Sequence, residues 1–341
     1  MTEPEALDSL YRDRPILKPT KRAYARHLLL LLVTFCTATI AGTMFPFGAI
    51  DTFPTDDPQT ATEVVNFLVS LPVRYAMMIG AAVQLILSNW ELLKYGLSFS
   101  ASLLFILISH EIGHYIACRI YRVDATLPFF IPTPPMLGPA GTFGAFIKIL
   151  SPMPSRRAVF DIGVAGPIAG FVALMPIALL GLATMQTIPP DQLVDREGML
   201  TFTDPLLMRL FASFFGIDLQ FGIGNAFYFA AWVGLLVTAL NLIPSGQLDG
   251  GHAIYAALGE KVHYWTGRIA FVVMATLSIV GFYFFNSPSG FLIAVILAVM
   301  MRIRHPQPWD MTPLDTKRKV VAFLTLVIFL LCFAPFPIQI N

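Results

Sequence analysis

The motif His110-Glu111-Ile112-Gly113-His114 lies inside an apolar run of the sequence. In a helix, residues four positions apart share one face, so both imidazoles can bind one zinc ion while Glu111 acts on a water molecule. Ionisable side chains inside an apolar span are costly unless they are used, which makes this cluster a candidate functional site. Two other interpretations are a polar packing cluster and a proton or ion relay in a transporter.

A zinc site with an open catalytic position needs a third protein ligand. Two carboxylates compete for this role, Asp161 and Asp249. Asp249 lies in the stretch 241–251, where proline and glycines interrupt an apolar helix, and broken helices at membrane depth usually line a cavity. Asp161 follows Arg156 and Arg157, where a helix N-terminus or an ion pair explains it without a metal. We therefore expect Asp249 to be the third ligand.

The composition indicates that the elements carrying these residues lie in a membrane. Of the 341 residues, 56% are hydrophobic and 13% are charged, against roughly 25% charged residues in an average soluble domain. The mean hydropathy is +0.71. The net charge of +1 gives no basic surplus for a nucleic-acid partner. We predict an all-α polytopic membrane protein with about seven transmembrane helices and a small membrane-associated β-hairpin or sheet.

The predicted spans follow from the lengths of the apolar segments. Seven of them are long enough to cross a bilayer: residues 28–48, 97–120, 159–184, 221–243, 269–285, 290–301 with its flanks, and 320–336. An eighth segment, residues 75–93, contains Gln84, Asn89 and Glu91. We interpret this eighth segment as a re-entrant or interfacial helix, because an additional span would invert every later loop.

Lysine and arginine are distributed unevenly along the chain. If the N-terminus is cytoplasmic and the seven segments span, 18 of the 22 Lys and Arg residues fall on the cytoplasmic side. Short cytoplasmic loops favour positive residues, so we predict that the N-terminus and the active site face the cytoplasm. The N-terminal arm contains acidic residues and is short for a plastid transit peptide, which favours a bacterial plasma membrane.

Residues 126–154 have a composition that differs from the apolar spans. Seven prolines, at positions 128, 132, 134, 135, 139, 152 and 154, exclude a continuous helix. Between them, residues 141–150 are apolar with aromatic and β-branched side chains, which predicts a strand or hairpin at the membrane face.

Both chemical motifs together are similar to those of a known family. His110-Glu111-x-x-His114 in a membrane helix, followed by Asn241-x-x-Pro244-x-x-x-Leu248-Asp249-Gly250, resembles the paired signature of the site-2 protease family of intramembrane zinc metalloproteases. Residues 138–145 and 165–170 resemble its bacterial and plastid subgroup. The resemblance covers about residues 97–260, and the exterior loop at residues 185–220 is too short for the PDZ domain that several bacterial members carry there.

The resemblance implies an intramembrane zinc metalloendopeptidase that cleaves transmembrane segments of membrane-protein substrates within the lipid bilayer. It implies one Zn²⁺ per chain, held by His110, His114 and Asp249 in a three-helix catalytic core, with Glu111 as the general base. The alternative is a transporter or ion-coupled carrier that uses the broken helix at residues 241–251 as its binding site. No oligomeric state is predicted.

Four further residues are candidates for substrate binding. Asn241 can bind the substrate backbone or the developing oxyanion, or it can form an interhelical hydrogen bond. A transmembrane substrate must be unwound before cleavage, and the edge of a strand at residues 141–147 offers it new hydrogen bonds. Gly141, Phe143 and Gly144 are the candidates on this strand. The alternative is a structural hairpin that only closes the cytoplasmic face.

We divide the chain into four regions: a cytoplasmic N-terminal arm at residues 1–27, a first transmembrane helix with an exterior or re-entrant segment at 28–96, a catalytic membrane core at 97–260, and C-terminal transmembrane helices at 261–341. His27, His263 and His305 lie beside basic residues at predicted cytoplasmic boundaries, so we expect them on the surface. We expect His252 either behind the metal ligands or in solvent.

Overall fold

The computed structural model describes residues 18–50, 59–189, 200–303 and 305–340. Most of the predicted cytoplasmic arm at residues 1–27 lies outside the described residues. The longer helices are α2 (Lys21–Thr43), α3 (Ala61–Ser88), α4 (Trp90–Ile120), α5 (Arg156–Ala183), α7 (Ala226–Leu242), α9 (Glu260–Phe285) and α11 (Thr316–Cys332). The shorter helices are α6 (Leu206–Phe215), α8 (Asp249–Leu258) and α10 (Gly290–Met300).

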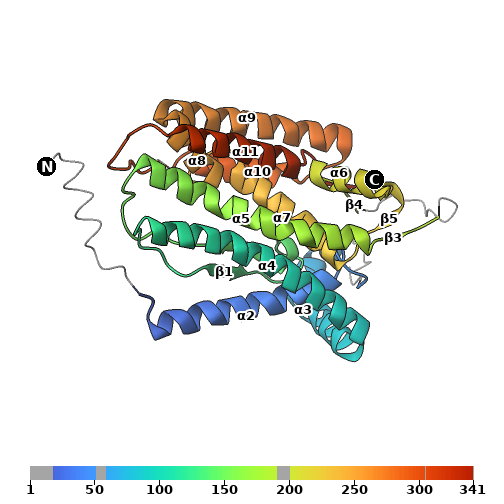
Figure 1. Ribbon diagram of the computed structural model, residues 1–341. Coiled ribbons are helices and arrows are strands. Elements are labelled where there is room, and N and C mark those ends of the chain that lie inside the picture. Colours follow the sequence, from blue (N-terminus) through green and yellow to red (C-terminus); the bar gives the residue numbers. More distant parts are fainter. Residues whose placement is uncertain (1–17, 51–58, 190–199, 304, 341) are drawn as a thin grey trace.

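Helices dominate the molecule and form one bundle, which confirms the predicted fold class. Figure 1 shows α4 and α5 side by side through its middle, with α2 on one side of this pair and α7 and α8 on the other. Helices α9 and α10 pack against each other, and α11 packs against α7. The ends of α4 and α8 and the start of α5 share one core cluster, in which Cys118, Phe160 and Tyr255 are fully buried.

The chain is a multi-pass membrane protein. Five of the described helices, α2, α3, α4, α5 and α9, are long and apolar enough to cross a membrane, and α7 and α10 are shorter apolar helices. The outer helices expose large apolar side chains, such as Val69 and Leu87 of α3 and Phe284 of α9. In water this surface would be unfavourable, whereas lipid tails solvate it without cost.

A polar residue separates α3 from α4. The side chain of Asn89 accepts hydrogen bonds from the backbone N–H groups of Glu91 and Leu92, and this caps the start of α4. Residues 75–93 therefore comprise the end of α3 and the first turn of α4. The prediction that they form a re-entrant or interfacial helix of their own is wrong in its boundaries, because the N-cap at Asn89 divides the segment.

The predicted break in the helix at residues 241–251 is present. Helix α7 ends at Leu242, just before Pro244, and α8 begins at Asp249. The turn between them folds back closely, so a Cβ atom at Gly250 would lie only 2.0 Å from the carbonyl oxygen of Leu242. Glycine at this position allows the backbone contact that places Asp249 at the first turn of α8.

The predicted hairpin is also present. Strand β1 (Phe129–Pro132) pairs antiparallel with β2 (Thr142–Phe146), and the 3-10 turn η1 (Pro139–Gly141) leads into β2. Two further pairs are β3 (Gln186–Thr187) with β5 (Gly222–Ile223), where η3 (Leu219–Phe221) precedes β5, and β4 (Leu200–Phe202) with β6 (Ile338–Ile340). The start of α2 and strand β4, which pairs with β6, lie at opposite ends of the bundle (Figure 1).

Candidate metal centre

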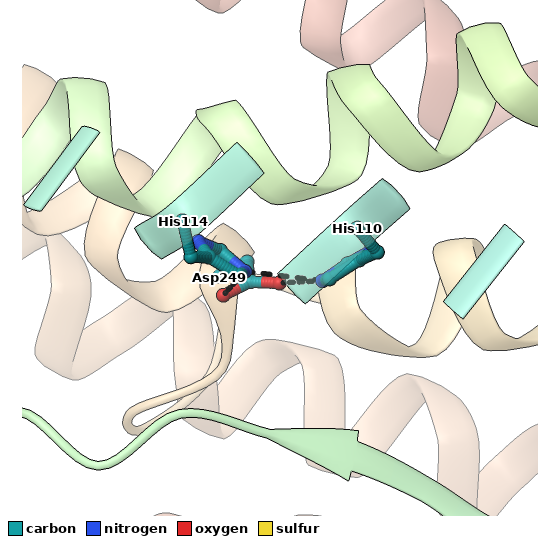
Figure 2. Close-up of side chains that lie close together, drawn as sticks. All are labelled: His110, His114 and Asp249. Carbon is teal, nitrogen blue, oxygen red and sulfur yellow. Dashed lines mark hydrogen bonds and ion pairs between the residues drawn. The ribbon is translucent and has the colours of Figure 1, made fainter. Parts of the chain in front are cut away.

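Helix α4 carries the HExxH motif on a buried face. His110, Glu111 and His114 have only 4%, 4% and 7% of their surface exposed, although α4 is otherwise apolar in this region. The two imidazoles point from α4 towards the first turn of α8, where Asp249 meets them (Figure 2). Two ionisable side chains one helical turn apart on α4 thus converge with a third, from far along the chain, inside a bundle of apolar helices.

The distances between these side chains fit a metal site. Nε2 of His110 lies 3.1 Å from Nε2 of His114 and 3.1 Å from Oδ2 of Asp249, and Nε2 of His114 lies 3.3 Å from Oδ1 of Asp249. Tetrahedral ligands at about 2.0–2.1 Å from a zinc ion are about 3.4 Å apart. Two neutral imidazoles and one carboxylate are also the donor types that zinc takes in catalytic sites, so the residues present fit Zn²⁺.

The hydrogen bond on the far side of His114 defines its tautomer. Nδ1 of His114 lies 2.6 Å from the carbonyl oxygen of Ile162 in α5. A carbonyl only accepts hydrogen bonds, so Nδ1 carries the proton, and in the neutral imidazole Nε2 presents its lone pair to the space between the three ligand atoms. Such outer hydrogen bonds orient metal-binding histidines and raise their basicity.

Glycines on α5 allow this helix to approach the motif closely. A Cβ atom at Gly166 would lie 2.1 Å from Nε2 of His114, and one at Gly170 would lie 3.1 Å from Cβ of His110. On the other side of the contact, a Cβ atom at Gly113 would lie 2.4 Å from the carbonyl oxygen of Ala165. Larger residues here would separate α5 from α4 and break the hydrogen bond between His114 and Ile162.

Glu111 has a carboxylate oxygen that its surroundings do not satisfy. Its Oε2 is buried and has no hydrogen-bond partner within the described parts of the chain. The backbone of Ile147, directly after β2, hydrogen-bonds the Glu111 carboxyl. A buried polar atom without a partner is unfavourable, and at a functional site it marks a position for a water molecule or substrate.

Asp161, the rejected candidate ligand, is engaged elsewhere. Its carboxylate accepts from Nε of Arg318 at 2.9 Å and from Nη2 at 2.6 Å, and it also accepts from the hydroxyl of Tyr121. The ion-pair interpretation is therefore confirmed, but the partner is Arg318 of α11 rather than Arg156 or Arg157. Sequence reasoning missed Arg318, because no local pattern links residues so far apart.

The four substrate-binding candidates lie on two elements. Asn241 is half-buried near the end of α7, before the break. Gly141 and Gly144 adopt positive φ angles of 74° and 94°, and the exposed fraction of Phe143 is 61%. The carbonyl oxygen of Gly141 accepts from the Thr37 hydroxyl at 2.8 Å and from the backbone N–H of Thr133, directly after β1, at 3.1 Å, so it is already engaged.

Two of the histidines expected on the surface are buried, so that prediction is wrong for them. His27 is 7% exposed and its Nδ1 lies 2.8 Å from the carbonyl oxygen of Pro128, while Nε2 of His263 lies 2.9 Å from the carbonyl oxygen of Gly246. His305 is half-buried and contacts His252. The neighbouring basic residues did not reveal which groups pack over these histidines.

The comparison with known families agrees with this geometry. Residues 98–281, more than half of the chain, match the model of Peptidase family M50, and they contain all three converging side chains and Glu111. The chain belongs to Peptidase family M50. This confirms the resemblance to the site-2 proteases that the two motifs indicated.

Individual relatives are described as probable zinc metalloproteases. The chain is 28% identical over 263 residues to "Probable zinc metalloprotease EGY2, chloroplastic" from Oryza sativa subsp. indica, covering 74% of this chain and 45% of the relative. It is 29% identical over 241 residues to "Probable zinc metalloprotease EGY1, chloroplastic" from Arabidopsis thaliana, covering 67% and 41%. The matched region thus spans less than half the length of these relatives.

Proposed function

We propose that this protein is an intramembrane zinc metalloendopeptidase that cleaves transmembrane segments of other membrane proteins. The observation that carries the proposal is the convergence of His110, His114 and Asp249 within a bundle of membrane-spanning helices, next to Glu111, whose Oε2 has no hydrogen-bond partner among the described residues. Membership of Peptidase family M50 supports a peptidase and favours it over the transporter alternative.

In this proposal His110, His114 and Asp249 hold one Zn²⁺ per chain. When bound, zinc supplies a Lewis acid that polarises a carbonyl and lowers the pKa of water towards about 7. The three protein ligands leave a fourth position open for the reaction, as in other catalytic zinc sites. Ile162 assists by holding His114 in the tautomer that directs its lone pair to the site.

Glu111 is the general base in the same proposal. Its buried Oε2 takes the proton of the attacking water and passes it to the leaving amine. This oxygen has no hydrogen-bond partner in the described parts of the chain, so it is available for both steps. Asn241 has an amide that can donate to the substrate backbone or to the oxyanion, and its place near the end of α7, before the break, supports this role.

Strand β2 is the proposed substrate-binding edge. Within the described residues β2 pairs with β1 along one edge only, and it contacts α4 close to Glu111. An extended substrate segment can pair with the other edge, which replaces the hydrogen bonds lost when its helix unwinds. Phe143 and Gly144 would contact the substrate, while Gly141 attaches the strand to α2 through Thr37.

We also propose the orientation and location of the protein. The bundle end with the start of α2, the end of α4 and the start of α5 carries Lys21, Arg22, Arg119, Arg156 and Arg157. Positive residues favour the cytoplasmic side, so this end and the metal centre would face the cytoplasm of a bacterial plasma membrane. The named relatives are described as chloroplastic, so their membrane differs from the one proposed here.

The experiment that tests the function compares Glu111→Gln with wild type in liposomes that contain a transmembrane substrate. We expect cleavage to fall at least about 100-fold in Glu111→Gln, because the general base is lost while the metal ligands remain. Glu91→Gln is the matched control, since Glu91 lies on the same helix with its side chain largely exposed. Equal cleavage by wild type and Glu111→Gln would remove Glu111 from the mechanism.

A further inference from the structure

A segment outside the family match lies across the end of the bundle that contains the metal centre. We call residues 305–318 the strap. They follow α10, include the first turn of α11 and contact the elements around the candidate metal site. The family match ends at residue 281, so the strap is not part of the matched region. We propose that the strap positions the metal ligands, with Arg318 and His305 as its positioning residues. This inference rests on the proposed function.

The first contact of the strap is with α8, which begins at Asp249. Nδ1 of His305 lies 2.8 Å from the carbonyl oxygen of Pro306, so this nitrogen carries the proton. Nε2 of His305 therefore accepts from Nδ1–H of His252, 2.6 Å away. The His305 ring also stacks on the fully buried ring of Tyr255, with centroids 3.9 Å apart. His252 and Tyr255 both belong to α8, so His305 holds two positions of this short helix.

The second contact is with the start of α5. The backbone of Asp310 pairs with the chain before α5: its carbonyl oxygen accepts from the N–H of Arg156 at 2.7 Å, and its N–H donates to Pro154. The Arg156 side chain then donates from Nε to the carbonyl oxygen of Ala256 in α8, at 2.5 Å. The strap, α5 and α8 are thereby linked in one hydrogen-bonded chain.

The third contact is Arg318 with Asp161 of α5 and Tyr121 at the end of α4. The guanidinium group donates two hydrogen bonds to the Asp161 carboxylate, and Nη2 donates to the Tyr121 hydroxyl at 3.0 Å. Bidentate pairs of this kind constrain geometry as well as distance. The pair is three-quarters buried, with 24% of the Arg318 side chain and 28% of the Asp161 side chain exposed, so water weakens it less than a surface pair.

The residues that the strap contacts lie on the same elements as the metal ligands or next to residues that hydrogen-bond them. Asp161 precedes Ile162, whose carbonyl oxygen accepts the hydrogen bond from His114 Nδ1. Tyr121 caps α4, which carries both histidines, and α8 carries Asp249. The strap therefore holds α4, α5 and α8 in one arrangement. If one of these elements shifts, the three ligand atoms no longer meet at one point.

The test measures how fast zinc leaves the purified full-length protein when an excess of chelator is added. We expect Arg318→Gln to release zinc about tenfold faster than wild type, because losing an outer contact commonly weakens metal binding by about 10–100-fold. Lys317→Gln is the matched control, since it removes the same charge from an exposed neighbouring residue of α11 and should release zinc at the wild-type rate. His305→Phe keeps the ring over Tyr255 but loses the bond to His252, and we expect it to accelerate release as well.

A spectroscopic measurement separates positioning from general stability. The visible spectrum of the Co²⁺-substituted protein reports coordination geometry, and we expect it to change in Arg318→Gln at temperatures well below unfolding. The double variant Asp161→Asn with Arg318→Gln should release zinc no faster than the more affected single variant, because both changes remove the same contact. If the effects of the two substitutions on the rate of zinc release add, Arg318 and Asp161 do not act through one shared contact.

Three results would overturn the inference or its basis. Wild-type protein that binds neither zinc nor cobalt overturns the proposed function, and this inference with it. Metal in wild type, with unchanged release and spectrum in Arg318→Gln, overturns only the inference. If Arg318→Gln does not fold, Arg318→Lys decides, since lysine keeps the charge but loses the bidentate geometry. Wild-type zinc release from folded Arg318→Lys and His305→Phe would then reject the role of the strap.

Discussion

His110 and His114 can direct their Nε2 atoms to one point because they lie one helical turn apart, but two histidines alone leave a zinc site incomplete. Asp249 completes it from a different helix, because the break before α8 turns the chain back towards α4. Its carboxylate lies with one oxygen near each imidazole. At the scale of single residues, the proposed chemistry thus depends on a few side chains, of which His114 is oriented by the hydrogen bond from its Nδ1 to the Ile162 carbonyl oxygen.

Phe143 provides the residue-scale prediction for substrate binding. Its side chain is 61% exposed on β2, so its removal should leave the fold unchanged. We expect Phe143→Ala to raise the KM for a transmembrane substrate about threefold to tenfold, as loss of an aromatic contact costs about 1 kcal/mol. The control is Phe214→Ala, which removes an 84% exposed phenylalanine from α6. An unchanged KM with Phe143→Ala would place substrate binding elsewhere.

At this scale the sequence predicted local motifs better than distant contacts. His110, Glu111, His114 and Asp249 were found because their types and spacing are unusual in apolar helices. Arg318 was missed because its partner Asp161 lies on another helix, and a lysine or arginine at a span boundary already has an explanation in membrane topology. Contacts that depend on tertiary packing leave no periodic signal in the sequence.

At the scale of elements, the close contact between α4 and α5 positions the proposed metal ligands. The two helices approach so closely that Gly166 faces the His114 ring without room for a side chain. This approach lets the Ile162 carbonyl reach His114. The zinc affinity of the proposed site therefore depends on the packing of α4 against α5 as well as on the ligands.

Gly166→Ala tests this contact. The added Cβ would lie 2.1 Å from His114 Nε2, so we expect α5 to shift, zinc to be lost and the protein to be destabilised by about 1–3 kcal/mol. Zinc content and thermal unfolding in detergent measure both effects. Gly80→Ala is the control, because a Cβ there has no neighbour within 4 Å and alanine favours the helix. Equal zinc content and stability in both variants would show that the contact tolerates a side chain.

The sequence also predicted most elements, with errors at their boundaries. The hairpin between α4 and α5 was expected from its prolines and glycines, and the break before α8 from Pro244 and its glycines. The segment 75–93 was misread because its polar residues suggested an interfacial helix, whereas Asn89 caps a new helix. Polar residues such as asparagine and glutamate occur both at helix N-caps and in interfacial helices. Composition alone therefore does not distinguish a capped helix start from an interfacial helix.

At the scale of the whole molecule, the basic residues at the start of α2, the end of α4 and the start of α5 share one end of the bundle with the candidate metal centre. The start of α2 is at this end, and strand β4, which pairs with β6, is at the other (Figure 1). The division of the chain at residues 96 and 260 remains a prediction, although α8 ends at Leu258 and α9 begins at Glu260.

Cysteine labelling tests the proposed orientation in intact cells. In a Cys36→Ser background, we expect Gln220→Cys to react with a membrane-impermeant thiol reagent from outside, because residue 220 lies at the end opposite the basic residues. Lys317→Cys, at an exposed position in the first turn of α11, should react only after the membrane is permeabilised. The reverse pattern would invert the protein in the membrane and place the metal centre on the exterior side.

The central claim is that His110, His114 and Asp249 hold a zinc ion, and the zinc content of purified protein tests it most directly. We expect the wild type to carry one zinc ion per chain, and Asp249→Ala to lose it while keeping its fold. Glu91→Ala is the control, since it removes a largely exposed carboxylate from the start of α4 and should retain zinc. Wild-type protein without zinc, or Asp249→Ala with zinc equal to wild type, would contradict the account.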